Sequence, residues 1–328
     1  MRIGKLTNEQ LKRIILSKIN PKHDVLAGAG VGEDCAALDF GGEACVLSTD
    51  PITGASENVG ALAVHISCND VASSGTRPVA MLVTLLVPPD NTLSDVENVV
   101  SEIIAEADSL GVDIIGGHTE VTDAVSRIVV STTAIGRTKS SRLIKSSGAK
   151  PGDDIIMTGY AAIEGTYIIA TEYKSKLDSV LTETEFKKAL DLGSKISVVK
   201  EGVIAGEFGV TAMHDITEGG VYGAVCELCE ASHVGCEINK DKIPLLDVTN
   251  KICTFLGINP YRLIGSGSML ITTADSGSLI RIFRQNGINA AIIGRITKKD
   301  IRVDDGGRQT ELSLTSEDEL FLLRYEDK

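Results

Sequence analysis

The sequence contains no tryptophan, and aromatic residues account for only 4% of its 328 residues. A buried interior must therefore be built mostly from Ile, Val, Leu and Ala. Many β-branched residues, together with 33 glycines, suit buried strands that are joined by tight turns. A chain of this length is too long for one ordinary hydrophobic core, so two domains of about 150 residues each are expected.

The sequence also lacks an excess of basic residues. Its 32 Lys and Arg residues are outnumbered by 45 Asp and Glu residues, which gives a net charge of -13. This balance argues against a general nucleic-acid binder or a binder of anionic membranes, because both need a basic face. An anionic small substrate is compatible with the charge, provided that cations bridge it to the protein.

Long apolar runs are missing as well. No uninterrupted run approaches the ~20 residues that a membrane-spanning helix needs, and the amino terminus carries Arg, Lys and Glu too densely for a signal peptide. A cytoplasmic location is therefore expected. The seven cysteines are odd in number and scattered, which favours reduced thiols over a disulfide framework.

The most informative pattern is an apolar run that ends in an acid and is followed by an acid-bearing helix. The run Ala44–Leu47 leads into Asp50, and the segment Gly60–Ser73 has helical spacing and carries Asp70 in its interior. Ligands of α/β proteins lie in loops at the carboxyl ends of strands. Acids at these positions predict a metal site.

Three further segments place acids beside glycines. In the first, a Gly-x-Gly-x-Gly pattern at 28–32 leads into Glu33 and Asp34. It fits neither a Rossmann fingerprint nor a Walker loop, so a nucleotide bound here would need Mg²⁺ between phosphate and carboxylate. A plain Gly-rich turn with solvated acids is the alternative. The second segment, Gly116–Glu120, follows an expected strand, and the third, His214–Gly220, precedes an expected helix whose glycine N–H groups can approach a phosphate.

The placement of these acids at strand ends would gather them at one edge of one sheet. Hard oxygen ligands gathered so closely repel each other unless a divalent cation lies among them, and Mg²⁺ with a phosphate is the common occupant. Each segment alone is a weak signal, whereas the joint arrangement predicts a Mg²⁺–phosphate site.

The remaining pattern alternates strands and helices, which is typical of an α/β fold. The nearly continuous apolar run Val79–Val87 predicts a strand that is covered on both faces. A helix over 95–110 follows, with Thr92 or Ser94 as its N-cap and Gly111 at its carboxyl end.

A mostly polar connector divides the chain. It covers residues 140–154 and is rich in Lys, Ser, Gly and Pro. We place the boundary inside it, between an amino-terminal domain at 1–148 and a carboxy-terminal domain at 149–328. Some antiparallel pairing is expected after residue 120.

Several motifs occur in an order and at spacings that resemble the PurM-like ATP-binding superfamily. They are GVGEDCAAL, LSTDPITG, AVHISCNDVASSGTRPVAMLVTLLVP, IIGGHTEVT, AKPGDDIIMTG and HDITEGG. The similarity covers nearly the whole chain and is greatest to the HypE-like, AIR synthase-related branch, whose members take part in hydrogenase maturation. The resemblance implies a two-domain α/β (α+β) fold in which the amino-terminal mixed sheet forms a barrel across a homodimer. It also implies ATP bound with Mg²⁺ near that interface.

The resemblance also assigns roles to single residues. The metal-holding aspartates correspond to Asp34, Asp50 and Asp70. Nucleotide-loop positions correspond to Asn69, Gly116, Gly117 and Thr119. The D-x-[ST]-x-G-G motif of the second domain corresponds to Asp215, Thr217, Gly219 and Gly220. Asp215 and His118 are the candidate catalytic residues. Lys5 is a candidate phosphate contact, with an ordinary surface lysine as the equal alternative.

Two departures from the family pattern matter. Many relatives read GGDT where this chain has His118, so Glu120 is a candidate replacement metal ligand, or His118 is a ligand itself. HypE ends in a tail whose terminal cysteine carries the group that is dehydrated to a nitrile. This sequence has no cysteine after Cys253, so the nitrile chemistry is not expected to proceed in that way here.

The expected activity is transfer of the γ-phosphoryl group of ATP to an amide-type or other small-molecule oxygen. A small-molecule kinase of the thiamine-monophosphate type is the alternative enzyme. A nucleotide-binding scaffold without turnover, in a maturation complex, is the alternative outside enzymes. A homodimer is expected, with neither nucleic acid nor membrane as partner.

Overall fold

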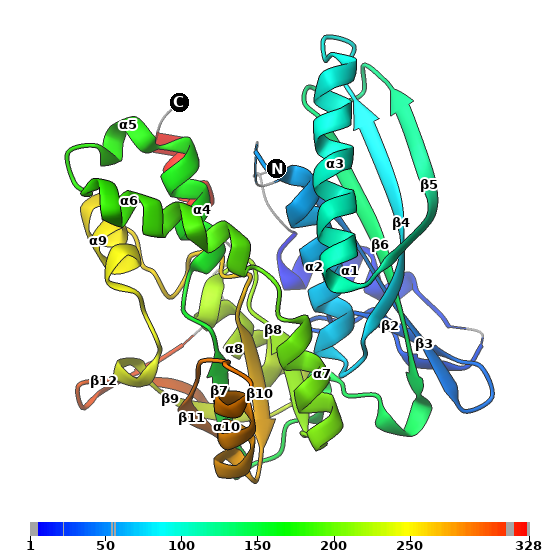
Figure 1. Cartoon of the computed structure of the whole chain (residues 1–328). Coiled ribbons are helices and arrows are strands. Elements are labelled where there is room, and N and C mark those ends of the chain that lie inside the picture. The colour runs from blue at the N-terminus through cyan, green and yellow to red at the C-terminus, as the bar shows by residue number, and fades with distance from the viewer. Residues whose placement is uncertain (1–5, 22, 54, 56, 313–317, 327–328) are drawn as a thin grey trace.

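The computed structural model describes residues 6–21, 23–53, 55, 57–312 and 318–326. Two β-sheets with their helices lie side by side (Figure 1). We call the first sheet with its helices the amino-terminal lobe and the second the carboxy-terminal lobe. Among the helices in these ranges, none combines the length and the hydropathy that a membrane span requires.

The amino-terminal lobe has a six-stranded sheet in the order β1-β2-β3-β6-β4-β5. Only the pair β4–β5 is parallel among the strands described. Helices α2 and α3 cover one face of this sheet (Figure 1). The strands are β1 Val25–Ala27, β2 Ala36–Asp39, β3 Glu43–Ile52, β4 Pro78–Val87, β5 Asp113–Val121 and β6 Val129–Lys139, and the helices are α1 Asn8–Ile14, a 3₁₀ turn Leu16–Lys18, α2 Val59–Ser73 and α3 Leu93–Leu110.

Local sequence signals explain the ends of these helices. Helix α3 begins with a capping box, in which the Thr92 hydroxyl accepts from the Asp95 N–H and the Asp95 carboxylate accepts from the Thr92 N–H. It ends at Gly111, whose φ of 67° is a left-handed conformation that glycine adopts without strain. Thr7 and Gln10 form the same box at the start of α1. The predicted caps Thr7, Thr92 and Gly111 are therefore confirmed.

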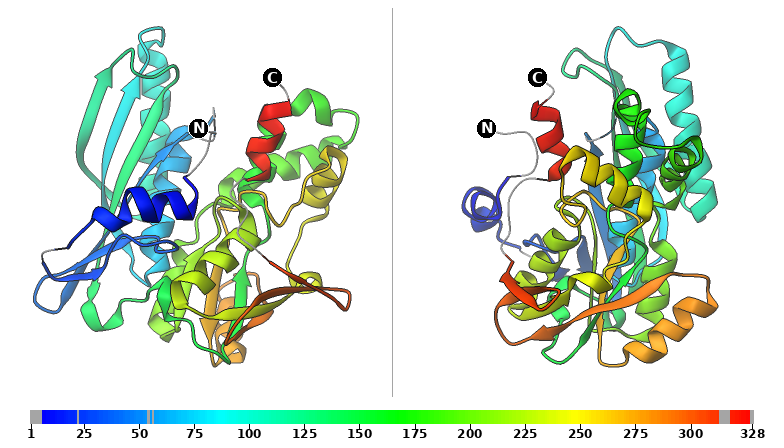
Figure 2. Two further views of the ribbon diagram at one scale, coloured as in Figure 1. Left: turned by 180° about the vertical axis from the view of Figure 1, so that it is seen from behind. Right: turned by 90° about the vertical axis from the view of Figure 1, so that its left-hand side faces the viewer.

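The carboxy-terminal lobe has a seven-stranded sheet in the order β13-β12-β9-β11-β7-β10-β8, in which only β9 and β12 pair in parallel among the described strands. Its strands are β7 Asp154–Thr158, β8 Ala212–Asp215, β9 Gly235–Asn239, β10 Met269–Thr273, β11 Ala290–Thr297, β12 Ile301–Asp305 and β13 Arg308–Glu311. Its helices are α4 Ile163–Glu172, α5 Lys174–Leu177, α6 Glu183–Leu190, α7 Val199–Phe208, α8 Gly220–Ser232, α9 Asp247–Leu256, α10 Ser276–Gln285 and α11 Glu319–Glu326. Figure 2 shows α11 close to α4 and α9 at the upper end of this lobe.

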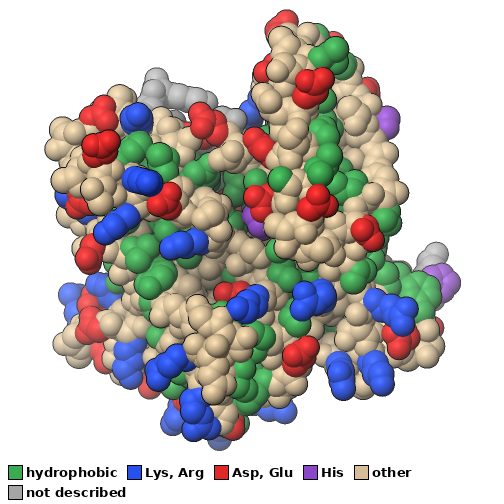
Figure 3. All heavy atoms as spheres, in the orientation of Figure 1, with side chains coloured by type: hydrophobic (Ala, Val, Ile, Leu, Met, Phe, Trp, Pro, Cys, Tyr) green, Lys and Arg blue, Asp and Glu red, His purple; other side chains and the backbone are tan. Residues whose placement is uncertain are grey.

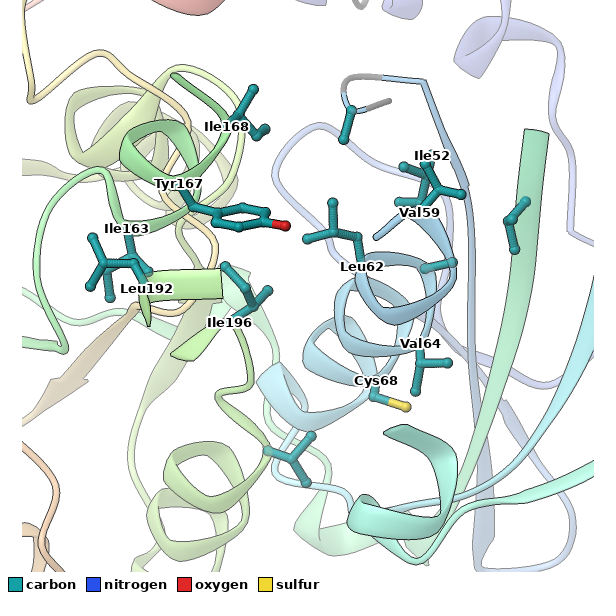
Figure 4. Packing of buried hydrophobic residues seen from close by; sticks show 14 of the residues in the cluster. Ile52, Val59, Leu62, Val64, Cys68, Ile163, Tyr167, Ile168, Leu192 and Ile196 are labelled. Carbon is teal, nitrogen blue, oxygen red and sulfur yellow. The ribbon is translucent and has the colours of Figure 1, made fainter. Parts of the chain in front are cut away.

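Helix α2 lies between the lobes and is buried along nearly its whole length. Apolar residues are spread around the whole helix, as is usual for a buried helix, and they enclose a few polar side chains such as Asn69 and Asp70. Leu62 on α2 belongs to one buried cluster with Tyr167 and Ile196 of the other lobe, and Figure 4 shows these three side chains pointing toward one another. The backbones also touch, because a Cβ added at Gly202 of α7 would lie 2.3 Å from the Ala72 carbonyl oxygen. The lobes are therefore packed tightly along α2.

Several strand predictions need correction. Strand β3 continues through Asp50 to Ile52, and β5 continues through the whole Gly116–Glu120 segment, so these acids lie within strands and not in loops after them. The run Val79–Val87 forms β4, but it is not covered on both faces, because Val79 and Leu82 are exposed.

Strand β10 begins only at Met269, since residues 261–268 form an irregular segment and not a strand. The sequence patterns also missed β9 and α9. The expected connector contains two 3₁₀ turns, Ser140–Arg142 and Ser146–Gly148. The second turn ends at the expected boundary, and the division into separate domains stays a prediction.

Candidate active site between the lobes

Asp70 lies at the centre of a buried acidic cluster. It is on α2 and only 5% exposed. Alternation along β3 places Ser48 and Asp50 on the same face as the buried Ala44 and Val46, against α2. The Ser48 hydroxyl donates a hydrogen bond of 2.5 Å to Oδ2 of Asp70. This contact orients the Asp70 carboxylate beside β3.

The environment of Asp70 opposes its ionisation. Burial raises its pKa well above the ordinary value, and the negative charges of Asp215, Asp50 and Asp34 raise it further, while the Ser48 hydrogen bond opposes the rise. The predicted metal ligands Asp34, Asp50 and Asp70 therefore act electrostatically on one centre. Asp215 from the other lobe joins them. The cluster lies between the two lobes and not at one edge of one sheet, which corrects the sequence-based expectation.

Asp34 reaches this centre because its loop is pressed onto α8. Gly32 has a φ of 77°, and a Cβ added there would lie 2.7 Å from the carbonyl oxygen of Glu227 on α8. Only glycine permits both this conformation and this approach. The Gly-rich turn at 28–32 thus serves to place Asp34 against the carboxy-terminal lobe, where Ser146 contacts it at 3.5 Å.

His214 joins Asp34 to Glu227. It lies on β8 and is 4% exposed. Its Nδ1 atom is 2.5 Å from Oδ1 of Asp34, a close ionic contact outside the geometry of a directed hydrogen bond. Its Nε2 atom is 3.1 Å from Oε2 of Glu227. Burial by itself lowers the pKa of His214, but the charges of Asp34 and Glu227 and their polar contacts outweigh burial and raise the pKa well above its ordinary value.

The cluster has the donor set that a divalent cation requires. Ligand atoms of Asp34, His214 and Asp215 lie within 4.8 Å of one another. Around an octahedral ion with bonds of about 2.1 Å, ligand atoms are separated by about 3 to 4 Å, so the spacing fits. The negative charges of Asp215, Asp50 and Asp34 add to the effect of burial in raising the pKa of Asp70, and a cation among these acids would offset their repulsion. The residues present therefore fit Mg²⁺.

Asn69 connects the two lobes. Its Nδ2 atom donates to the Ile196 carbonyl at 2.8 Å, and its Oδ1 atom accepts from the Val198 N–H at 2.8 Å. The side chain is fully buried. These bonds hold α2 against the segment that leads into α7. Both ends of the Asn69 amide are therefore engaged with the backbone, and its contact with a nucleotide stays a prediction.

The Asp215–Gly220 segment forms the turn into α8. The Thr217 carbonyl accepts from the N–H groups of Gly220 at 3.1 Å and Gly265 at 3.2 Å. A Cβ added at Gly220 would lie 2.7 Å from the Leu263 carbonyl oxygen. The Gly219 N–H donates to Oδ2 of Asp318 at 2.6 Å. A carboxylate of this chain thus contacts the loop that was predicted to approach a phosphate.

Asp318 is only 1% exposed and also accepts from the Leu320 N–H at 2.8 Å. Burial raises its pKa to about 7, while the N–H groups of Leu320, Gly219 and Ile264 oppose the rise.

The Gly116–Glu120 segment lies away from the cluster. It is exposed throughout, and Nε2 of His118 contacts Oε2 of Glu120 at 3.2 Å. Asp50 is separated from β5 by β6 and β4, or about 14 Å at about 4.8 Å per strand.

His118 and Glu120 also face the opposite side of the sheet from Asp50. They pair with Thr84 and Leu86, which alternate with the buried Met81, Leu85 and Val87 of the helix-covered face. Within one chain, the structure therefore does not bring His118, Thr119 or Glu120 to the aspartates. Gly117 has a structural role, because a Cβ there would lie 1.8 Å from the Val83 carbonyl oxygen. Lys5 lies outside the described residues.

Sequence reasoning missed three residues of this region. His214 directly precedes Asp215 in the HDITEGG motif, so this position next to a predicted site residue could have identified it. Glu227 lies seven residues beyond Gly220 on a helix whose apolar pattern gave no reason to single it out. Asp318 carried no motif, because its contact with Gly219 depends on how the end of the chain packs.

The chain matches two family descriptions. "AIR synthase related protein, N-terminal domain" matches residues 32–138, and "AIR synthase related protein, C-terminal domain" matches residues 150–306. A "Putative hydrogenase expression/formation protein" of Methanocaldococcus jannaschii is 31% identical over 90% of this chain and 89% of its own length. The carbamoyl dehydratase HypE of Rhizobium leguminosarum bv. viciae is 27% identical over 82% of this chain and 78% of its own.

Solved structures share the fold. A chain in the crystal structure of a HypE–HypF complex matches with a TM-score of 0.78 at 20% identity, over 93% of this chain and 99% of that one. AaThiL complexed with AMPPCP and TMP matches with a TM-score of 0.74 at 21% identity, over 94% and 99%. The predicted PurM-like fold of mixed α and β structure is confirmed.

Proposed function

The chain belongs to the AIR synthase related protein family, and on that premise we propose that it is a Mg-ATP-dependent enzyme that transfers the γ-phosphoryl group to an amide-type or other small-molecule oxygen. The observation that carries the proposal is the convergence of four aspartates between the lobes, where the side chains of Asp34, Asp70 and Asp215 are buried and that of Asp50 is half-buried. Asp34, Asp50 and Asp70 act there together with Asp215. Such a concentration of negative charge is suited to cations that hold a triphosphate.

The residues of the chain orient and shield the reacting groups. Asp34, Asp50, Asp70 and Asp215 would hold Mg²⁺, which when bound supplies the positive charge that phosphoryl transfer requires. Ser48 fixes the direction of the Asp70 carboxylate. The packing of α2 between the lobes keeps bulk water from the acids. In the transfer, the bond from the γ-phosphorus to the oxygen of ADP breaks as the bond to the acceptor oxygen forms.

The acceptor and the pathway are inferred from relatives. Relatives are named as a carbamoyl dehydratase and as a hydrogenase expression/formation protein, which favours an amide-type oxygen and a role in hydrogenase maturation. The HypE–HypF complex favours a maturation partner. Among the described cysteines, Cys35 and Cys45 are half-buried and the others are buried. We take the acceptor amide to belong to a small molecule or to another protein, and we place the reaction in the cytoplasm.

Transfer to a small phosphate or alcohol is the second candidate reaction. The likeness to AaThiL complexed with AMPPCP and TMP is the observation that favours it. In that case the phosphoryl group stays on the product and no dehydrated compound appears. The alternative outside enzymes is a nucleotide-binding scaffold without turnover. Such a scaffold would release ADP no faster than a variant in which Asp50 and Asp70 are replaced by Asn.

A homodimer through the amino-terminal sheet completes the proposal. Strand β5 is the edge of that sheet, and Ile115 at 59% and Val121 at 67% exposure lie on it. An exposed apolar edge strand of this kind is normally covered. A second copy that covers it would bring His118 and Glu120 into an interface, where they could complete a site that one chain alone leaves without them.

Stabilisation by MgATP tests the site. At 100 times its dissociation constant, a bound ligand adds about 2.7 kcal/mol to the free energy of unfolding. We expect this gain for the wild type and for Glu43→Gln, a half-buried acid on the same strand as Asp50 that pairs with Arg137 outside the cluster. The double variant Asp50→Asn with Asp70→Asn should lose it. An equal gain in all three proteins would overturn the metal-site proposal, and ADP release with each candidate acceptor then separates the two reactions.

A further inference from the structure

His214 is oriented from behind by a carboxylate. Its Nε2 atom contacts Glu227, while Nδ1 on the other side of the ring contacts Asp34. A ligand atom of Asp215 lies within 4.8 Å of those of His214 and Asp34. Histidines that bind metals in proteins usually have this arrangement, in which one ring nitrogen contacts a carboxylate and the other contacts the ion. The orientation of the ring therefore matches that of a metal ligand.

The state of Nδ1 is the second observation. This atom is buried and has no directed hydrogen bond, although a carboxylate oxygen lies 2.5 Å away. Two donors on the same octahedral ion lie about 3 Å apart. Binding of an ion would release the Nδ1 proton, and a small separation of His214 from Asp34 would then let both contact one ion, with Asp215 within the same 4.8 Å limit.

We propose that Nδ1 of His214 is a direct nitrogen ligand of the divalent cation, in a site that it forms with Asp34 and Asp215. The inference rests on the proposed function, because the ion lies in the same acidic cluster. It adds a ligand that the four aspartates do not predict. Imidazole suits Mn²⁺, Co²⁺ and Zn²⁺ better than Mg²⁺, so this site should accept such ions readily.

The proposed site also joins the two lobes through the ion. Asp34 belongs to the hairpin between β1 and β2, whereas His214 and Asp215 end β8. The side chains come from sequence positions 180 residues apart, but the contact of Gly32 with the backbone of Glu227 already holds the two elements together. The cation would therefore bind a largely pre-formed position.

Binding of Mn²⁺ to the full chain tests the inference by electron paramagnetic resonance. We expect a magnetic coupling between bound Mn²⁺ and a ¹⁴N nucleus, and its replacement by a ¹⁵N coupling when only histidine is labelled. His214→Gln should remove the coupling and weaken Mn²⁺ binding at least tenfold. Glu227→Gln should keep the coupling and weaken binding less.

His65→Gln is the matched control, since His65 is also buried and paired with a glutamate, at 3.0 Å from Glu106, but outside the cluster. It should leave the Mn²⁺ affinity and the coupling unchanged. If the wild type binds Mn²⁺ without a histidine coupling, the inference is wrong and the proposed function stands. If the wild type binds no Mn²⁺ at all, both fail. Where His214→Gln does not fold, the labelling of the wild type still shows that a histidine binds the ion, and a coupling that His118→Gln retains excludes the exposed histidine of β5. A coupling lost in His118→Gln would overturn the inference.

Discussion

Two segments with a similar look, Gly32–Asp34 and Gly117–Glu120, occupy opposite environments. The first is pressed onto α8, so that Asp34 is buried among charges of both lobes. The second lies on an edge strand against which no described element packs on its outer side, and its exposed Glu120 contacts its neighbour His118. The comparison shows that a glycine next to an acid in the sequence is not sufficient to predict a metal site. What packs against the acid decides how strongly it interacts.

The charged residues on the surface can be compared with the buried acids. On the face shown in Figure 3, Lys and Arg gather over the lower part of the molecule, whereas Asp and Glu follow α3. The basic side chains are interspersed with acids and form no continuous basic face, in agreement with the net charge of -13. The buried acids thus differ from these surface charges in environment and not in type.

The largest effect is expected for Asp70→Asn. Loss of this carboxylate should lower ATP turnover at least a thousandfold, or about 4 kcal/mol of transition-state stabilisation. In the absence of a cation the variant should be more stable than the wild type at neutral pH. The reason is that a folded pKa raised above the unfolded value removes stability as the pH rises, and Asn does not ionise. Steady-state turnover and urea unfolding measure the two effects, and a destabilised variant would contradict the second.

Asp318 provides the next comparison, a buried carboxylate that accepts from several backbone N–H groups and on which the charge of Glu218 is only a small influence. Its folded pKa of about 7 lies above the unfolded value of about 3.9. Its stability contribution is therefore full below about pH 4 and is lost as the pH rises to 7, by up to about 4 kcal/mol. Asp318→Asn should escape this loss.

Urea unfolding at intervals between pH 4 and 8 tests the Asp318 prediction. The stability difference between Asp318→Asn and the wild type should grow up to about pH 7 and then stay constant. A difference that does not change with pH would show that Asp318 ionises normally in the folded protein.

Substitution of the glycines sharpens the contrast between the two segments. Gly32→Ala and Gly117→Ala should each cost about 2 to 3 kcal/mol of stability, because each added Cβ meets backbone atoms. Only Gly32→Ala should also weaken Mn²⁺ binding, since it displaces Asp34 from β8. Chemical unfolding and a metal titration measure the pair. Equal losses of metal affinity would contradict the separation of β5 from the site.

The smallest effect is expected for Glu120→Gln. Its exposed contact with His118 should contribute less than about 0.5 kcal/mol to the stability of the chain. MgATP affinity should change only under conditions where the protein forms dimers, which sedimentation at several concentrations can establish. A large loss of affinity in a monomeric protein would place Glu120 in the site of a single chain.

Local patterns explain why much of the fold was predictable. Capping boxes and the left-handed Gly111 depend on residues within one turn of each other, so Thr7, Thr92 and Gly111 could be read directly. Helix α2 was found because its apolar spacing is continuous. Strand ends were less predictable, since β3 and β5 continue only because β6 and β4 offer partners for their backbone groups.

The sequence by itself determined the acids, their family and the helix that carries Asp70. Only the tertiary structure decided that His214 and Glu227 accompany Asp34, that Asp318 contacts Gly219, and that Glu120 faces away from Asp50. The physical reason is the range of the interactions. A cap or a helical stripe depends on neighbours in the chain, whereas the electrostatics of a carboxylate depends on whichever distant elements exclude water from it.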